Sequence, residues 1–411
     1  MTKNPYLLFF PFLLFFIVFV LKFHSDVMEG DEGRYLFFAQ NLLHGFYSPL
    51  VPDINLWNGP GYPIILIPFV ALHLPLIWIT LMNAVFYYLS IIFLFKALQL
   101  IVTFRKALMF SLFWACFYNS YQKIPRILTE TFVLLLMTLL IFCIVNAFNN
   151  RSKNYLFLSG FSIGYIVLTK VIFGYVLMFM LIGSGLLWII NRNAANNRKG
   201  LFIMLIAFAT AAPYLIYTYH LTGRVFYWSN SGGASLYWMS TPYKGEFGDY
   251  RGGEYVEGHR KDFERIAILK GVERDDALKR IAFNNIKAYP FKYAQNCIAN
   301  IGRMFFNFPY SPSSISYKGV GNPIRSVVML PPNAIIFSLL IFCLVLTLIN
   351  WGKVIYYIRF LFCFVFLYLG ISTIVSAYSR QFYVIVPILI FWIAYIIQKS
   401  LTIKIKLDKN V

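Results

Sequence analysis

The residues best suited to chemistry in this sequence are acids near the N-terminus. Asp26, Glu29, Asp31 and Glu32 fall within seven residues, whereas the whole chain has 16 Asp and Glu against 36 Lys and Arg. A carboxylate can accept the proton of a hydroxyl group that attacks another molecule. Acids at a helix start can instead cap free N–H groups and complement the helix dipole. Asp31 and Glu32 therefore suit either a general base or a helix start.

The residues after these acids predict the element that positions them. Apolar side chains recur with the spacing of one helix face, at Tyr35, Phe38, Ala39, Leu42 and Leu43. Gly45 then provides a stop signal. We therefore expect a short amphipathic helix that begins at Asp31 and Glu32 and lies on a membrane surface.

The composition predicts an all-α integral membrane protein. Hydrophobic residues make up 59% of the 411 residues and charged residues only 13%. A membrane-crossing helix needs about 20 largely apolar residues, and such segments recur almost from end to end. We expect about ten spans, near residues 5–23, 76–98, 107–122, 130–148, 155–169, 171–190, 201–220, 333–350, 354–376 and 381–398. The apolar stretch 62–74 is too short to span and contains two prolines, which favours a half-inserted or surface helix.

The charges predict how these spans are oriented. Lys and Arg residues between the spans fall on one face, at Lys3, Lys96, Arg105, Lys106, Arg151, Lys153, Arg192, Arg198, Lys199, Lys353, Arg359, Lys399, Lys404, Lys406 and Lys409. Basic residues favour the cytoplasmic side, so we expect both termini to be cytoplasmic. The net charge of +20 then reflects this bias and does not indicate nucleic-acid binding.

The same topology divides the chain into three parts. Residues 1–221 form a transmembrane module with a first extracytoplasmic loop at 24–61, residues 222–332 an extracytoplasmic loop region, and residues 333–411 the last spans and a basic tail. Within the large loop we expect helices near 259–269, 275–288 and 291–306, with a break at Pro290. The five cysteines show neither a disulfide framework nor metal-site spacing.

Charged residues at span ends meet on the outer face. They are Asp31 and Glu32, the segment Lys123–Arg126, Glu130, Lys170, and Arg380 followed by Tyr383. Carboxylates beside several cations suit a substrate that carries a phosphate and a sugar, because Arg and Lys can neutralise a departing phosphate. Simpler roles exist for each residue. Arg126 and Glu130 can pair at i,i+4, Lys170 can extend to the interface, and Arg380 can anchor a span end.

An ordered set of short motifs resembles the GT-C superfamily of membrane glycosyltransferases. The likeness is to the bacterial branch related to protein O-mannosyltransferases and to the aminoarabinose transferases that act on lipid A. The motifs are Asp31-Glu32 with Tyr35 and Gly45, Asn58-Gly59-Pro60-Gly61-Tyr62-Pro63, Leu128-Thr129-Glu130, Leu168-Thr169-Lys170, Gly232-Gly233, and Arg380 seven residues before Pro387. They cover most of the chain in order. Asn58-Gly59-Pro60 stands where these relatives carry Lys-Pro-Pro or His-Pro-Pro.

The resemblance implies transfer of a hexose or pentose from a polyprenyl-phosphate donor to a hydroxyl of a lipid, glycan or protein. Asp31 would be the catalytic base, and Glu32 and Glu130 would orient the acceptor or sugar. Lys170 and Arg380 would bind the donor phosphate, and Tyr35, Arg126 and Tyr383 complete the expected site. No metal is required, because side chains can neutralise a leaving group that carries one phosphate. Binding of a divalent ion by Asp31 and Glu32 is the alternative.

The resemblance also implies a bacterial plasma membrane location with an extracytoplasmic site. Two other functions stay open at this point. One is a transporter or flippase of lipid-linked sugars, and the other is a polymerase or ligase of lipid-linked glycans.

Overall fold

The computed structural model describes residues 4–149, 151–250, 256–315 and 323–408, and within them the chain is α-helical with no β-strand. In these ranges, seven helices are long and apolar enough to cross a membrane. They are α1 (Pro5–Phe23), α4 (Leu76–Leu98), α7 (Glu130–Phe148), α9 (Ile172–Ile190), α10 (Ala195–Thr222), α16 (Pro323–Ile349) and α17 (Tyr356–Ile374). The predicted all-α membrane fold is confirmed.

Helix α7 lies at the centre of the bundle. In the most apolar stretch of 18 residues in α7, 83% of the residues are buried inside the protein. The corresponding share in α1 is 17%. It packs against α4 on one side and against α8 (Lys153–Thr169) on another. The first residue of α7 is Glu130, so the most enclosed helix of the protein places a carboxylate at its end.

Three of the ten expected spans are either broken or shorter than the roughly 20 residues that a membrane-crossing helix needs. The expected span 107–122 is α5 (Phe104–Ala115) followed by the single turn α6 (Tyr118–Tyr121). Helix α8 has 17 residues and ends at Thr169. The last expected span is divided into α18 (Ser379–Tyr383) and α19 (Val386–Asp408), with Pro387 at the start of α19, where proline is best tolerated.

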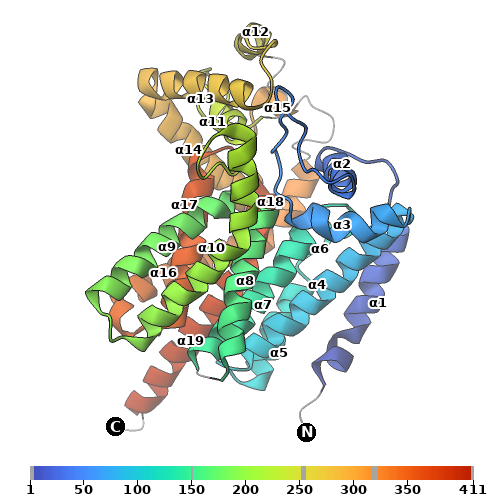
Figure 1. Ribbon diagram of the computed structural model, residues 1–411. Coiled ribbons are helices and arrows are strands. Elements are labelled where there is room, and N and C mark those ends of the chain that lie inside the picture. Colours follow the sequence, from blue (N-terminus) through green and yellow to red (C-terminus); the bar gives the residue numbers. More distant parts are fainter. Residues whose placement is uncertain (1–3, 150, 251–255, 316–322, 409–411) are drawn as a thin grey trace.

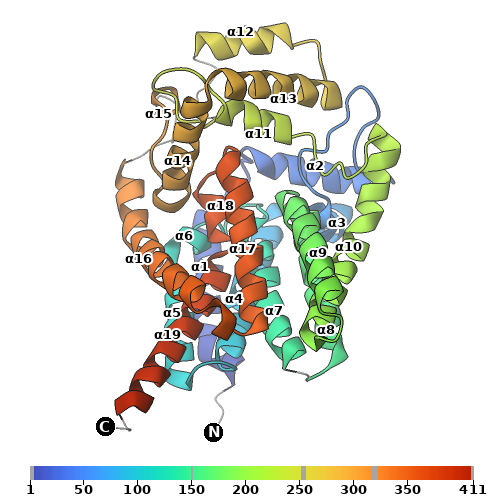
Figure 2. The ribbon, with the colours of Figure 1, turned by 90° about the vertical axis from the view of Figure 1, so that its left-hand side faces the viewer.

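Helices of the first loop, of the apolar stretch after it and of the large loop form a layer across one end of the bundle (Figures 1 and 2). This outer layer consists of α2 (Asp31–Leu43), α3 (Gly61–Ala71), α11 (Gly232–Met239), α12 (Glu257–Arg265), α13 (Gly271–Ala288), α14 (Pro290–Phe306) and α15 (Pro312–Ile315). Helices α2 and α3 agree with the two short helices expected from the sequence. Helices α12, α13 and α14 match the three helices expected in the large loop, and Pro290 opens α14.

Both ends of the chain lie at the opposite end of the bundle from this layer (Figure 1). The short 3-10 helix η2 (Trp351–Lys353) joins α16 to α17 there. The shared position of the termini agrees with the expected topology, while the cytoplasmic assignment of that end stays a prediction. We call the end that carries the outer layer the outer end.

Candidate active site

Asp31 lies at the first turn of α2, where its carboxylate meets two arginines. Gly30, directly before the helix, has a φ of +63°, a backbone conformation that suits glycine. The Asp31 side chain is 11% exposed. Its Oδ2 accepts a hydrogen bond of 2.7 Å from Nη1 of Arg380, and its Oδ1 accepts one from Arg34. The expected base and the expected phosphate ligand, 349 positions apart, are therefore in direct contact.

These two arginines decide the ionisation of Asp31. Burial alone would raise the pKa of the Asp31 carboxyl, but the guanidinium groups of Arg380 and Arg34 outweigh burial and hold the pKa below its ordinary value. Conversely, burial opposes the charge of Arg380, while Asp31 and Glu130 raise its pKa above the ordinary value. Asp31 is thus a carboxylate at neutral pH, as a general base must be.

Glu32 has a different set of partners from its neighbour. Its Oε1 accepts a hydrogen bond from the backbone N–H of Ile127 at 2.8 Å, and its Oε2 accepts from Arg126 at 3.0 Å and from the N–H of Glu29 at 2.9 Å. With 5% of its side chain exposed, Glu32 fastens the start of α2 to the segment before α7. A role for Glu32 in the reaction itself stays a prediction.

Arg126 does not form the i,i+4 pair that the sequence allows. Its guanidinium lies against Glu29 at 2.7 Å and Glu32 at 3.0 Å, because the segment before α7 turns toward α2 and away from the side chain of Glu130. Burial by itself would lower the pKa of Arg126, but Glu29 and Glu32 raise it above the ordinary value. Arg126 is therefore a cation that holds two elements together.

Glu130 forms its ion pair with Lys170 instead. Nζ of Lys170 donates to Oε1 of Glu130 at 3.0 Å, and the two side chains are 14% and 4% exposed. Lys170 therefore points into the protein and does not extend to the interface. The other oxygen of Glu130, Oε2, is buried and has no hydrogen-bond partner among the described residues. Such atoms are rare in folded proteins and call for an explanation.

Tyr35 lies beside both ion pairs. Burial raises the pKa of its phenol, and the charges of Asp31 and Glu130 raise it further, so Tyr35 is a neutral hydroxyl at any physiological pH. Its oxygen accepts a hydrogen bond of 3.3 Å from Nδ2 of Asn58. Asn58 is the first residue of the Asn58-Gly59-Pro60 motif. Its own Oδ1 is buried and lacks a hydrogen-bond partner in the described part of the chain.

The linker before Arg380 is held in place by α14. Nδ2 of Asn300 donates to the carbonyl of Val375 at 2.7 Å, and Nε of Arg303 donates to the carbonyl of Ala377 at 3.2 Å. Both side chains are fully buried. Sequence reasoning missed these two residues, although their spacing on one helix face was a usable signal. It also missed Arg34, which follows Asp31 at i+3, a spacing that brings side chains together.

Tyr383 occupies a different position from the other expected site residues. Its side chain is 2% exposed, and its ring lies edge-on to Phe117 with 5.9 Å between centroids. Tyr383, the last residue of α18, thus packs in the core against the turn before α6. Its expected contact with substrate stays a prediction.

A divalent metal does not fit Asp31 and Glu32 as they are arranged. Both oxygens of Asp31 accept from guanidinium groups, which would repel a cation. Glu32 points to Arg126 and to a backbone N–H. In the described ranges no three His, Cys, Asp or Glu residues gather as a metal site.

Comparisons with known proteins give little beyond this geometry. No protein-family model matches the sequence, and no curated protein matches it. Among solved structures, the chain is similar to the crystal structure of ArnT from Cupriavidus metallidurans bound to undecaprenyl phosphate. The identity is 10% and the TM-score 0.44, over 96% of this chain and 78% of that one. A likeness at this level assigns neither ligand nor activity, so the function has to be argued from the residues of the chain itself.

Proposed function

We propose that this protein is a membrane glycosyltransferase of GT-C type that uses a polyprenyl-phosphate sugar donor and a hydroxyl acceptor. The observation that carries the proposal is the meeting of Asp31, Arg380, Glu130 and Lys170 at one end of the bundle. These residues belong to four separate segments of the chain. The sequence predicts each of them as part of a site for this chemistry. A protein within the membrane has access to a lipid-linked donor. The buried ion pairs contain the proposed base, Asp31, and two cations, Arg380 and Lys170.

The reaction we propose is a single displacement at the anomeric carbon of the sugar. Asp31 accepts the proton of the acceptor hydroxyl, and the acceptor oxygen forms a bond to the anomeric carbon. The bond between that carbon and the phosphate oxygen breaks, and polyprenyl phosphate leaves with the electron pair. Arg380 neutralises this phosphate, since guanidinium groups bind phosphate in a bidentate manner. One displacement inverts the anomeric configuration.

Binding of the donor would also prepare the base. Arg380 contacts Asp31 at 2.7 Å, so a donor phosphate has to share or take over this guanidinium. Asp31 then loses part of its neutralising charge and becomes a stronger base. Because the Arg380 side chain is 32% exposed, a phosphate can reach it without unfolding the site.

The unpaired polar atoms support a sugar between the two ion pairs. Oε2 of Glu130 and Oδ1 of Asn58 are buried acceptors without a partner in the described structure. A sugar hydroxyl is a donor that either oxygen could accept from. We infer that Glu130 orients the sugar while Lys170 keeps it ionised.

The proposal is tested with the purified full-length chain in nanodiscs and a panel of polyprenyl-phosphate sugars. Asp31→Asn retains the size of the residue but cannot accept the proton, so transfer should slow by at least about 100-fold. The matched control is Asp26→Asn, because Asp26 belongs to the same acidic stretch but is 82% exposed and pairs only with His24 among the described residues. Full activity of Asp31→Asn would end the assignment of this residue as the base. Movement of the lipid-linked sugar across the bilayer of sealed liposomes that contain the protein, without transfer, would indicate a flippase instead.

A further inference from the structure

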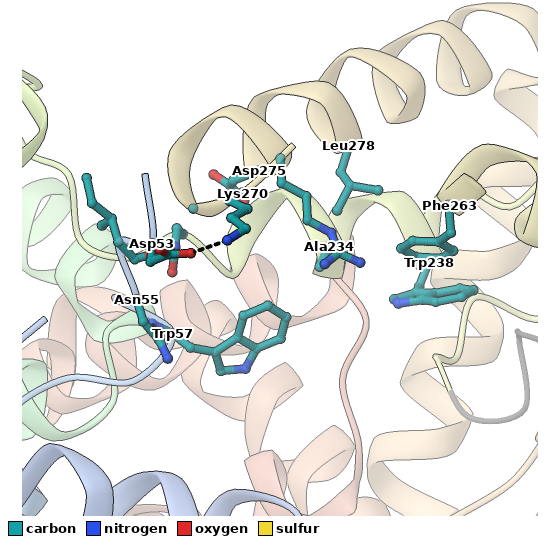
Figure 3. A pocket seen from close by; sticks show the side chains of 13 residues that line it. Asp53, Asn55, Trp57, Ala234, Trp238, Phe263, Lys270, Asp275 and Leu278 are labelled. Carbon is teal, nitrogen blue, oxygen red and sulfur yellow. Dashed lines mark hydrogen bonds and ion pairs between the residues drawn. The ribbon is translucent and has the colours of Figure 1, made fainter. Parts of the chain in front are cut away.

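A cavity of about 530 Å³ opens in the outer layer, between the first loop and the helices of the large loop (Figure 3). Its volume lies in the range of about 300–1,000 Å³ that is typical of small-molecule sites. Asp53, Asn55 and Trp57 line one side, and residues of α11, α12 and α13 line the other. None of the site residues expected from the sequence lines this cavity.

The cavity walls are fixed by polar contacts. Nδ2 of Asn230 donates to the carbonyl of Ile54 at 2.8 Å, and the N–H of Leu56 donates to Oδ1 of the same asparagine at 3.0 Å. Lys270 and Asp53 form an ion pair of 2.8 Å at the rim. The first loop is thus held against the large loop by the residues just before Trp57. The cavity is a preformed site, which reduces the entropy that a ligand would lose on binding.

Three aromatic rings face the cavity. Figure 3 shows Trp57 on one side and Trp238 and Phe263 on the other. Trp238 and Phe263 lie side by side with 5.3 Å between their centroids and 35° between their planes, while Trp57 is 39% exposed. The faces of such rings carry partial negative charge and therefore attract the C–H groups on the face of a sugar ring, which carry partial positive charge.

The polar residues of the cavity suit hydroxyl groups. Asn55 offers an amide group that can both donate and accept. The guanidinium carbon of Arg274 lies 5.7 Å from the centroid of the Phe263 ring. Arg274 is an exposed residue that lines the cavity, and its guanidinium can donate hydrogen bonds to a ligand. Rings, amide and guanidinium together match a saccharide better than they match a lipid chain.

The cavity is connected to the candidate active site through Trp57. The guanidinium carbon of Arg34 lies 5.4 Å from the centroid of the Trp57 ring, and Arg34 donates to Asp31. A saccharide in contact with Trp57 therefore lies next to the arginine that holds the proposed base. A donor bound at Arg380 would approach Asp31 through its other oxygen, Oδ2.

We propose that this cavity binds the saccharide part of the acceptor and so selects which hydroxyl reaches Asp31. The role of this saccharide as an acceptor rests on the proposed transferase function. Its binding to the cavity does not depend on transfer. Trp57, Trp238 and Arg274 are then specificity-determining residues. The acceptor would be a glycan or a glycosylated lipid or peptide, whose shared chemistry is a sugar ring that carries hydroxyl groups.

The test is direct binding without donor. Purified full-length chain in nanodiscs is applied to an array of neutral and acidic oligosaccharides, each displayed on a lipid linker and on a peptide linker. We expect the wild type to bind one class of saccharide. Trp57→Ala and Trp238→Ala should each weaken that binding by roughly tenfold or more, the usual effect of removing a central tryptophan. A preference for one linker identifies the source of the saccharide.

Trp351→Ala is the matched control, because Trp351 is similarly exposed, at 36%, and lies at the opposite end of the bundle. It should bind as the wild type does, and thermal unfolding of all variants checks that they are folded. No binding by the wild type, or equal binding by the wild type, Trp57→Ala and Trp238→Ala, overturns the proposal. If the protein binds a saccharide through both tryptophans but transfers no sugar, the saccharide site stands. Only the proposed transferase function is then refuted.

Discussion

At the scale of single residues, the candidate site is a set of opposed charges whose pairings could not be taken from the sequence. Asp31 and Arg380 meet across 349 positions, and Glu130 meets Lys170 across 40. The sequence placed all four at the outer end because span ends and acid positions determine sidedness. It could not say which acid faces which cation, because that depends on how the helices pack. Arg126 shows the difference, since it pairs with Glu29 and Glu32.

Arg380→Ala tests the proposed contact with the donor phosphate. Loss of a hydrogen bond to a charged group costs about 1.5–3 kcal/mol, so kcat/KM for the donor should fall by roughly ten- to a hundredfold. Arg260→Ala is the control, because Arg260 belongs to the same outer layer but is 64% exposed and pairs with Glu264 within its own helix. Unchanged kcat/KM in Arg380→Ala would remove this residue from the site.

The same variant should change the pH dependence of transfer. Arg380 and Arg34 hold the pKa of Asp31 below its ordinary value, so wild-type kcat/KM should decline only below the usual carboxyl range of about 4. Removal of Arg380 removes a neutralising charge and raises that pKa. The acidic limb of the pH profile should therefore move to higher pH in Arg380→Ala. A limb that stays in place would show that another group titrates there.

At the scale of elements, the amphipathic helices could be predicted and the breaks between helices could not. Helix α2 and helices α12–α14 follow from apolar spacing, Gly45 and Pro290, which act locally. The division of residues 104–121 into α5 and α6 depends on a distant partner, since Nδ2 of Asn119 donates to Oδ1 of Asn333 at 2.8 Å. Helix α11 was missed because two glycines at its start resemble a turn.

Glu32→Gln tests whether Glu32 joins α2 to the segment before α7. A glutamine amide keeps one acceptor but loses the charge that faces Arg126, so we expect a loss of about 1–3 kcal/mol in the free energy of unfolding. Glu29→Gln removes the exposed partner of the same arginine, 70% exposed, and should change stability by less than about 1 kcal/mol. Equal losses in these two variants, measured by thermal unfolding, would contradict a special role of the buried carboxylate.

His259 should make the stability of the outer layer depend on pH. Burial lowers the pKa of this imidazole to about 4, whereas an unfolded chain would protonate it near 6.5. Between these values the unfolded state binds more protons, so stability falls as the pH falls. We expect up to about 3 kcal/mol to be lost between pH 6.5 and pH 4.

Thermal unfolding of the full chain at pH 7 and pH 4.5 measures this loss. In His259→Gln the imidazole is absent, and the decrease in Tm between the two pH values should shrink accordingly. His44→Gln, at an exposed position, should behave like the wild type. A decrease in Tm that is the same in all three proteins would assign the pH dependence to other groups.

At the scale of the whole molecule, the distribution of charge agrees with the arrangement of the ends. Both termini lie opposite the outer layer (Figure 1), as the alternation of basic segments predicts. Which of these ends faces the cytoplasm is a matter for experiment. Reporter fusions at Asn230, in the outer layer, and after the last residue of the chain should give opposite signals. The same signal from both would refute the predicted topology.

The contact between Asp31 and Arg380 has a consequence for the order of biosynthesis. Asp31 leaves the ribosome within the first tenth of the chain, but its partner follows only after almost all the membrane helices have been made. A chain truncated before Arg380 therefore lacks the cation that pairs with Oδ2 of the buried Asp31 carboxylate, however well its earlier helices insert.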